Sequence, residues 1–398
     1  MNPPETADLK LSPVRKRELP GATEKIDRFL ATKRPSLPCV VIDLDVVRAR
    51  YSALRASFPD ATIFYAVKAN PAADVLATLA FLGAKFDLAS GGEIERCLNL
   101  AIAPERLSFG NTIKRESEII QAHRNGIDRF AFDSIGELEK VARAAPGARV
   151  FCRLLVAAQG ADWPLTRKFG CDAEMALELL GRARGLGLDP KGLSFHVGSQ
   201  QTDPLQWRAP IATAAGIFHA CAGRGLDLAF LNIGGGLPAQ YRTPIPVLDA
   251  YAEVIETALR EHFGASRPEI IIEPGRYLVG DAGVLRSEVL LVAKKSQKAA
   301  KRWVYLDAGR YNGLPETQNE RICYRIRTPH DGVRCKPVTL AGPTCDSTDI
   351  IYERAGYELP IALDIGDTID FLSAGAYTAS YASVEFNGYA PIPTYCIR

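Results

Sequence analysis

Residues 62–100 read TIFYAVKANPAADVLATLAFLGAKFDLASGGEIERCLNL. In this stretch the β-branched and aromatic runs TIFYAV (62–67) and KFDLA (85–89) are each followed by residues whose apolar spacing is typical of an amphipathic helix. A strand, a helix and a second strand in this order favour parallel pairing of the strands through a helical crossover. The stretch therefore predicts an α/β fold.

The same alternation continues towards the C-terminus. Further strand-like runs follow at LSFG (107–110), RFAFD (129–133), VFCRLL (150–155), LSFHV (193–197), AFLNI (229–233) and EIIIE (269–273). Eight strand–helix units close a (β/α)8 barrel of the TIM type, which takes about 250 residues. A doubly wound open sheet is the competing architecture, but no dinucleotide-binding glycine fingerprint follows the first strand. We therefore predict the barrel.

The pattern changes after about residue 283. The runs SEVLLVAK, RWVYLDAG, KPVTLAG and DTIDFLSAG are separated by turn residues without helical crossovers, which predicts a C-terminal antiparallel β domain. At the other end, charged and proline-punctuated residues predict an arm with a short helix over 24–32. The predicted division is an arm that joins the β domain (1–38), a barrel (39–282) and the β domain (283–398).

Composition limits the classes of partner. The 398 residues carry a net charge of +2, which gives no reason to expect nucleic acid or an anionic membrane as a partner. No apolar run approaches the ~18 residues that span a bilayer, and the N-terminus lacks the apolar core of a secretory signal, so we expect a cytoplasmic protein. Nine scattered cysteines without a CxxC pair argue against disulfides and structural zinc, and we expect no metal.

Reactive residues fall near the ends of the predicted strands. Barrel enzymes keep their chemistry at the C-terminal ends of their strands. The residues found there are Lys68, Asp87, Arg153, His196, the glycines 234–236, Glu273 and Arg276. Together they would place a nucleophilic amine, an imidazole, acids and a phosphate-type loop at one mouth.

Several of these residue types suit a phosphate-bearing carbonyl cofactor. Apolar neighbours of Lys68 would desolvate its amine and lower its pKa, which favours the neutral form that makes a Schiff base. The glycines 234–236 would let backbone N–H groups approach a phosphate closely, at the strand ends where barrels usually bind one. Arg276 could add a charge-assisted contact to the same phosphate.

Eight motifs, in chain order, carry a family resemblance: YAVKAN, FDLASGGE, HVGSQ, NIGGG, EPGR, GPTCDSTD, SAGAYT and FNGY. As a set they resemble the ornithine and diaminopimelate decarboxylases of the alanine-racemase-like fold, which depend on pyridoxal 5′-phosphate (PLP). The resemblance covers roughly residues 38–395.

The resemblance implies a role for each motif residue. Lys68 would hold PLP as a Schiff base, His196 would stack on the pyridine ring, and Glu273 would keep the ring nitrogen protonated so that the ring accepts electrons. Arg153 and Asp87 would support the ring and the lysine. The phosphate would be held by Ser199, Gly235, Gly236, Arg276 and Tyr377.

The resemblance also implies a homodimer with shared active sites. Cys345 and Asp346 of one subunit would reach the site of the other, where Cys345 would return a proton to the substrate Cα. Asp346 stands where diaminopimelate enzymes carry glutamate and would receive a distal ammonium; its structural alternative is an exposed turn residue. Phe386 belongs to a segment that resembles the lining of the diamine end of the ornithine pocket.

These features favour decarboxylation of L-ornithine to putrescine, in polyamine synthesis. The alternatives are a lysine or dual lysine/ornithine decarboxylase, then a diaminopimelate decarboxylase. Outside the enzymes, the alternative is a catalytically silent PLP-binding regulatory homologue. One departure concerns a second substrate-binding acid of the eukaryotic ornithine enzymes: this sequence aligns Arg325 there, with Glu316 or Glu320 as substitutes.

Overall fold

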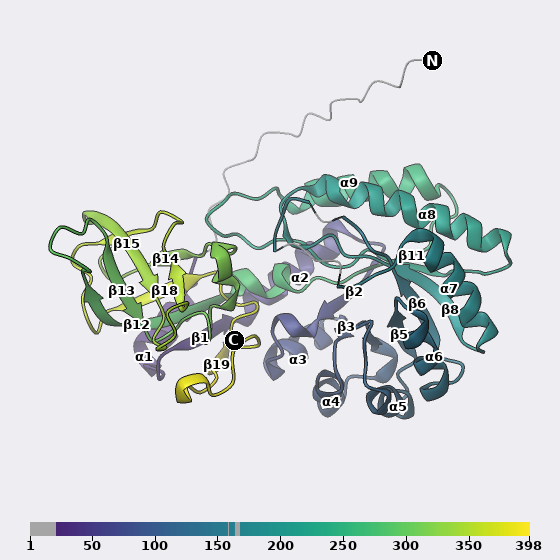
Figure 1. Cartoon of the computed structure of the whole chain (residues 1–398), viewed down its shortest axis with the longest axis horizontal. Helices are drawn as coiled ribbons and strands as arrows, with labels where there is room; N and C mark the ends of the chain where they lie inside the picture. Colours follow the sequence, from purple (N-terminus) through teal and green to yellow (C-terminus); the bar gives the residue numbers. More distant parts are fainter. Residues whose placement is uncertain (1–20, 158, 164–167) are drawn as a thin grey trace, which may run out of the picture.

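The computed structural model describes residues 21–157, 159–163 and 168–398. They form two domains that lie side by side along the long axis of the molecule (Figure 1). A barrel with its helices lies on the right of this view, and a β domain lies on the left. The first part of the predicted arm, residues 1–20, lies outside the described residues.

Eight parallel strands form the barrel in the closed order β10-β11-β2-β3-β4-β5-β6-β8. Their bounds are β2 Ala61–Ala66, β3 Lys85–Leu88, β4 Leu107–Phe109, β5 Arg129–Phe132, β6 Arg149–Arg153, β8 Asp189–Ser194, β10 Phe230–Asn232 and β11 Glu269–Ile272. Each predicted strand run overlaps one of these strands, so the predicted (β/α)8 barrel is confirmed.

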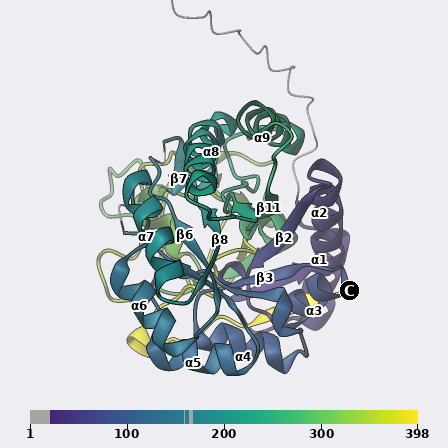
Figure 2. The same cartoon turned by 90° about the vertical axis from the view of Figure 1, so that its right-hand side faces the viewer.

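Helices form an outer ring around these strands (Figure 2). Their bounds are α2 Leu44–Ser57, α3 Ala73–Phe81, α4 Gly91–Asn99, α5 Glu116–Arg124, α6 Ile135–Ala144, α7 Ala173–Gly185, α8 Arg208–Gly223, α9 Leu248–Phe263 and α10 Arg276–Val279. The 3₁₀ turns of this domain are η1 Val67–Ala69, η2 Pro104–Arg106, η3 Pro204–Trp207 and η4 Gly280–Ala282. A separate two-stranded ribbon pairs β7 Ala161–Trp163 with β9 Ser199–Gln201.

Large side chains fill the barrel interior. One buried cluster there is made of Phe64, Ala131, Phe151, Phe230 and Ile271. Gly192 of β8 makes room for Phe230, because a Cβ at this position would lie 2.5 Å from the ring. A barrel filled in this way is a packed core, so its reactive groups must stand at its ends.

The second domain is a nine-stranded sheet in which most neighbouring strands run antiparallel, as predicted. Two pairs, β13 with β15 and β1 with β19, are parallel. The strands are β1 Cys39–Asp43, β12 Gly283–Ala293, β13 Arg302–Leu306, β14 Arg325–Arg327, β15 Cys335–Ala341, β16 Ile350–Tyr352, β17 Glu358–Pro360, β18 Thr368–Leu372 and β19 Thr394–Ile397. Helix α1 (Glu24–Lys33) and the 3₁₀ turns η5 (Pro315–Glu320) and η6 (Phe386–Gly388) complete the domain.

Strand β1 belongs to this β domain, although the sequence division assigned residues from 39 onwards to the barrel. It pairs antiparallel with β12, with Cys39 opposite Arg286, and parallel with β19, with Val40 opposite Thr394. Helix α1 packs on it through Ile26. The run CVVID is uniformly buried, and nothing within it indicates which of the two sheets it joins.

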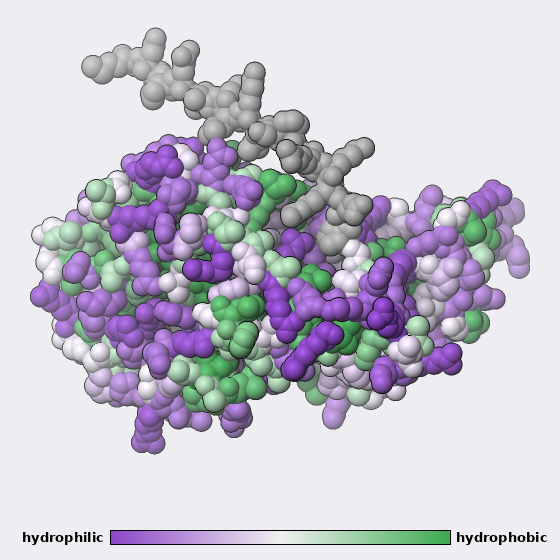
Figure 3. All heavy atoms as spheres, turned by 180° about the vertical axis from the view of Figure 1, so that it is seen from behind, coloured by the Kyte–Doolittle hydropathy of each residue, from purple (hydrophilic) through white to green (hydrophobic). Residues whose placement is uncertain are grey.

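Hydrophilic residues cover much of the face that Figure 3 shows, and apolar residues gather mainly near its middle. Among the exposed large apolar side chains are Tyr381, Val384 and Phe386, which lie close together in the C-terminal segment. Within the described ranges, no helix is both long enough and apolar enough to cross a membrane.

Candidate active site

The structure brings the predicted barrel residues together at one end of the barrel. Lys68 lies in η1 directly after β2, Arg153 ends β6, and Glu273 directly follows β11. Asp87 lies near the end of β3, and His196 lies two residues beyond β8. Because the strands are parallel, these positions surround a single mouth.

Lys68 and Asp87 form an ion pair at this mouth. The Lys68 Nζ lies 3.5 Å from the Asp87 Oδ2. Burial lowers the pKa of Lys68, but the nearby acidic groups, Asp87 first among them, more than offset it, so the pKa lies above its ordinary value. The prediction of a neutral Lys68 amine is therefore wrong for the cofactor-free protein. Burial raises the pKa of Asp87, so Asp87 is the neighbour that can share the Lys68 proton.

Glu273 is held by an asparagine that the sequence interpretation missed. Asn232, the last residue of β10, donates its amide N–H to the Glu273 Oε1 and accepts from the Gly234 N–H at 2.9 Å. Burial, assisted by the charge of Asp87, raises the pKa of Glu273 to about 7. Asn232 could have been predicted, because it is a polar residue at the end of an apolar strand run.

His196 carries a neutral ring. Burial lowers its pKa well below the usual range, and the charges of Arg153 and Lys68 add to this effect. Its Nδ1 accepts a hydrogen bond from the Gly198 N–H at 3.0 Å. An uncharged imidazole fixed in this way can lie flat against an aromatic ring without a charge to desolvate.

The loop after β10 fits only glycine. A Cβ on Gly235 would lie 2.4 Å from the Glu273 carbonyl oxygen, and a Cβ on Gly236 would lie 2.6 Å from the Gly198 carbonyl oxygen. Gly236 also has a φ of +111°, which is strained for other residues. The bare backbone of this loop therefore lies against His196 and Glu273 at the mouth.

Arg276, at the start of α10, is the centre of a buried cluster. Its guanidinium donates to Ser199, Tyr241 and Glu316, with both Glu316 oxygens engaged at 2.6 and 2.7 Å. The Tyr377 ring centroid lies 4.8 Å from the Arg276 Cζ. Tyr241 and this pairing of Glu316 were not predicted, because no local pattern links them to Arg276.

Glu316 and Glu320, the acids expected to substitute for the second substrate-binding acid, both bind other groups. Glu316 faces Arg276, and the Glu320 Oε1 accepts from the backbone N–H groups of Glu353 and Arg354, both at 2.7 Å. Arg325 donates to the Ser373 hydroxyl at 3.0 Å. Neither carboxylate is therefore placed to receive a substrate ammonium.

The remaining predicted residues lie together on exposed loops of the β domain. The Cys345 N–H donates to Asn387 at 3.1 Å, and the neighbouring Phe386 ring lies 4.7 Å from that of Tyr311. Asp346 accepts from the hydroxyl and backbone N–H of Thr348, which lowers its pKa. In the described part of the chain, no hydrogen bond, ion pair or ring contact connects Cys345, Asp346 or Phe386 with Lys68, His196 or Glu273.

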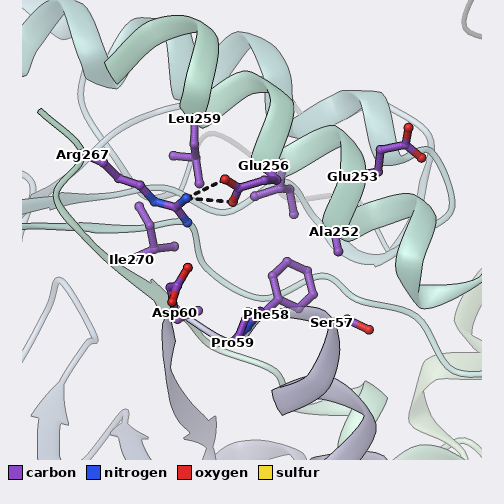
Figure 4. Close-up of a pocket in the computed structure, with 12 residues that line it drawn as sticks. Ser57, Phe58, Pro59, Asp60, Ala252, Glu253, Glu256, Leu259, Arg267 and Ile270 are labelled. Carbon is purple, nitrogen blue, oxygen red and sulfur yellow. Dashed lines mark hydrogen bonds and ion pairs between the residues drawn. The ribbon is translucent and has the colours of Figure 1, made fainter. Parts of the chain in front are cut away.

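A hollow of about 270 Å³ lies at the opposite end of the barrel, where β2 and β11 begin (Figure 4). Its lining includes Phe58, Leu259 and Ile270, and Arg267 pairs there with Glu256 at 2.6 Å. None of the predicted reactive residues lines it. The chemistry therefore belongs to the mouth that carries Lys68.

The mouth fits a ligand of the pyridoxal phosphate type. Among the described residues, the buried Asp87 Oδ1 has no hydrogen-bond partner, which is costly unless a further group satisfies it. An amine, a neutral imidazole, a protonatable carboxyl and a bare glycine loop are the groups that such a cofactor needs at its carbonyl, ring and phosphate.

Known proteins share this sequence and architecture. Residues 44–280 match the family model described as pyridoxal-dependent decarboxylase, pyridoxal binding domain. The lysine/ornithine decarboxylase of Selenomonas ruminantium is 34% identical over 94% of this chain and 92% of its own length. The ornithine decarboxylase of Rattus norvegicus is 34% identical over 88% of this chain and 78% of its own length.

Among solved structures, the crystal structure of SrLDC in complex with PLP and cadaverine matches with a TM-score of 0.84 at 33% identity, and the match covers 94% of each chain. The family model alone covers more than half of the chain, and the full-length matches include both domains. The chain therefore belongs to the family of PLP-dependent ornithine/lysine decarboxylases and is a PLP-dependent amino-acid decarboxylase.

Proposed function

We propose that this enzyme decarboxylates L-ornithine to putrescine, as a step of polyamine synthesis in the cytoplasm, and that it works as a homodimer with shared active sites. The observation that carries the substrate proposal is Asp346. Its hydrogen bonds from Thr348 lower its pKa, so its carboxylate is charged at neutral pH, and it lies partly exposed on a loop. A carboxylate is the group that can receive a desolvated distal ammonium.

Bound PLP supplies a conjugated ring that accepts the electron pair left when the carboxylate leaves Cα. Lys68 would be the attachment point, with Asp87 taking up its proton. Glu273, which Asn232 orients, would face the ring nitrogen and hold a proton there. His196 and Arg153 would support the ring from the protein side.

Several donors would hold the phosphate. The backbone of Gly235 and Gly236 approaches the mouth closely, and the Ser199 hydroxyl lies 3.0 Å from the Arg276 Nη2. Tyr377 would add its hydroxyl, which lies close to Gly275. These groups are hydrogen-bond donors that fix an anion at the end of the barrel strands.

The dimer proposal rests on how the described part of one chain places two groups of predicted site residues: one lies on loops of the β domain and the other at the mouth of the barrel. Cys345 and Phe386 are exposed, and Asp346 is partly exposed. Among the described residues, none of the three forms a hydrogen bond, ion pair or ring contact with Lys68, His196 or Glu273, although the resemblance assigns all of them to one site. A two-fold arrangement would bring these loops of one subunit to the mouth of the other. Cys345 would then lie where a proton returns to the substrate Cα.

Lysine is the second candidate substrate. The relative from Selenomonas ruminantium is named for both lysine and ornithine, and its sequence matches nearly the whole chain. Ornithine and lysine differ by one methylene, which a hydrophobic pocket distinguishes by only about 1–3 kcal/mol. We rank ornithine above lysine because Phe386 belongs to the segment that resembles the lining of the diamine end of the ornithine pocket.

The deciding experiment measures carbon dioxide release by purified enzyme from L-ornithine, L-lysine, L-arginine and diaminopimelate. We expect the highest kcat/KM with ornithine. The variant Asp346→Ala should lose at least about thirtyfold in kcat/KM for diamino acids, as when a charged contact to a ligand is removed. It should still bind PLP. Asp331→Ala, on another loop of the same domain, is the control, and unchanged kcat/KM in Asp346→Ala would contradict the assignment.

A further inference from the structure

The Arg276 guanidinium uses every N–H that it has. An arginine carries five N–H donors. The Nη1 donates to Tyr241 and Glu316 at 2.8 and 2.7 Å, and the Nη2 donates to Glu316 and Ser199 at 2.6 and 3.0 Å. The Nε donates to the same Ser199 oxygen at 3.3 Å. Glu316 and Tyr241 thus hold the far end of the group, and the Nε/Nη2 edge faces Ser199.

The hydrogen bonds at the two edges of the Arg276 guanidinium differ in strength. Glu316 makes a charge-assisted, two-pronged contact, which is among the stronger protein hydrogen-bond arrangements. Ser199 offers one neutral oxygen, shared between two donors. A phosphate that arrives at this cluster would therefore displace Ser199 from the Nε/Nη2 edge more easily than it would displace Glu316.

Glu316 also cancels the charge of Arg276. Both side chains are buried, with exposures of 2% for Arg276 and 4% for Glu316. In such surroundings the charges are little screened, so the pair presents a net charge near zero. A phosphate placed beside it gains from the N–H groups of Arg276 but is also repelled by Glu316.

We infer that Glu316 is a positioning residue that sets the affinity of the phosphate subsite: it holds Arg276 in place before the cofactor arrives and weakens the electrostatic attraction for the phosphate. This inference rests on the proposed assignment of Arg276 to the phosphate. In consequence, binding of the phosphate depends chiefly on uncharged donors, namely Ser199, Tyr377 and the glycine loop.

The test measures the dissociation constants of inorganic phosphate and of PLP by calorimetry on cofactor-free protein, at two ionic strengths. Glu316→Gln keeps the size of the side chain and removes its charge. It should bind both probes at least about tenfold more tightly than wild type, with a steeper loss of affinity at high salt. Glu320→Gln makes the same change in the same 3₁₀ turn, away from Arg276, and should behave like wild type.

Equal or weaker binding by Glu316→Gln, with Glu320→Gln unchanged, would overturn the inference. The double variant Arg276→Met/Glu316→Gln separates this failure from failure of the site assignment. It should bind phosphate more weakly than Glu316→Gln, and equal binding by the two would show that Arg276 does not contact the phosphate. If Glu316→Gln does not fold, the salt dependence of wild-type binding carries the test: phosphate affinity should change little between the two ionic strengths, and a steep loss at high salt would overturn the inference.

Discussion

The carboxylate of Glu316 and the guanidinium of Arg276 form a buried ion pair that joins the β domain to the barrel. Arg276 begins α10 of the barrel and Glu316 lies in η5 of the β domain, with Nη2 and Oε1 2.6 Å apart. Taking two charges out of water is costly, but their contact and the hydrogen bonds to Ser199 and Tyr241 offset this cost. Removing one partner therefore leaves the other charged, buried and uncompensated.

Glu316→Ala should lower the free energy of unfolding of the cofactor-free protein by about 3–5 kcal/mol, the usual cost of breaking a buried pair. The matched control is Glu256→Ala, which breaks the more exposed pair with Arg267 and should cost about 0–1 kcal/mol. Urea denaturation of both variants in phosphate-free buffer measures the difference. Similar losses in the two variants would mean that the buried pair contributes no more than a surface pair.

Lys68 should be the residue that carries the cofactor. Borohydride reduction followed by mass spectrometry should find a pyridoxyl group on Lys68. Lys114 is an internal comparison, because burial lowers its pKa to about 8 and it is more readily neutral than Lys68. Its side chain is fully buried and pairs with Glu137 at 2.8 Å, and it should remain unmodified. Modification of Lys114, or of no lysine, would contradict the site.

The stability of the cofactor-free enzyme should depend on pH through Glu273. Its pKa is about 7 in the folded protein against 4.5 as the ordinary value, so the folded state holds a proton that the unfolded chain releases between these pH values. The free energy of unfolding therefore falls as pH rises through this window.

Glu273→Gln cannot titrate, so this decrease should be smaller in the variant. Relative to wild type, the variant should gain up to about 3 kcal/mol at about pH 8 and much less at about pH 5. Urea denaturation of cofactor-free wild type and Glu273→Gln across this range measures the effect. The same pH dependence in both proteins would show that Glu273 ionises normally.

Shared active sites predict complementation between inactive subunits. Lys68→Ala and Cys345→Ala alter opposite sides of the proposed interface, so each mixed dimer would keep one intact site. After subunit exchange, a mixture should recover up to about a quarter of wild-type activity.

The control for complementation mixes Lys68→Ala with Glu273→Ala. Both changes lie at the mouth of the same barrel, so no mixed dimer has an intact site and no recovery is expected. Absence of recovery in the first mixture, once exchange is demonstrated by native mass spectrometry, would exclude sites shared in this way.

Much of the fold could be predicted because each barrel strand is a short apolar run followed by a helix. The least accurate strand is β8, which begins at Asp189 although the predicted run begins at residue 193. The residues Asp189-Pro190-Lys191-Gly192 have poor strand propensity, and their extended backbone is imposed by pairing with β6. The assignment of β1 failed for a related reason, because its pairing partners lie more than 240 residues away in the sequence.

The site residues that could be predicted are those that lie at the ends of the barrel strands. Lys68, Asp87, Arg153 and Glu273 follow from their positions alone, since parallel strands bring these ends together. Their electrostatics do not follow in the same way: local apolar neighbours suggested a neutral Lys68, whereas Asp87, from the next strand, raises its pKa.

Contacts between residues far apart in the chain could not be predicted from the sequence either. Glu316 reaches Arg276 from the other domain, and Asn232, at the end of β10, reaches Glu273 directly after the neighbouring strand β11. Neither contact has a local pattern, so only the folded chain reveals it.

The placement of β1 between β12 and β19 also orders the events of synthesis. The barrel strands all lie between Ala61 and Ile272, so all eight have been synthesised while more than a hundred residues are still to be added. Strand β1 is made before any of them but gains its last neighbour only when Thr394–Ile397 emerge. A nascent chain thus has a complete set of barrel strands while the apolar strand β1, made earlier, is still unpaired on one side, and the sheet of the second domain is completed only after β19 has been made.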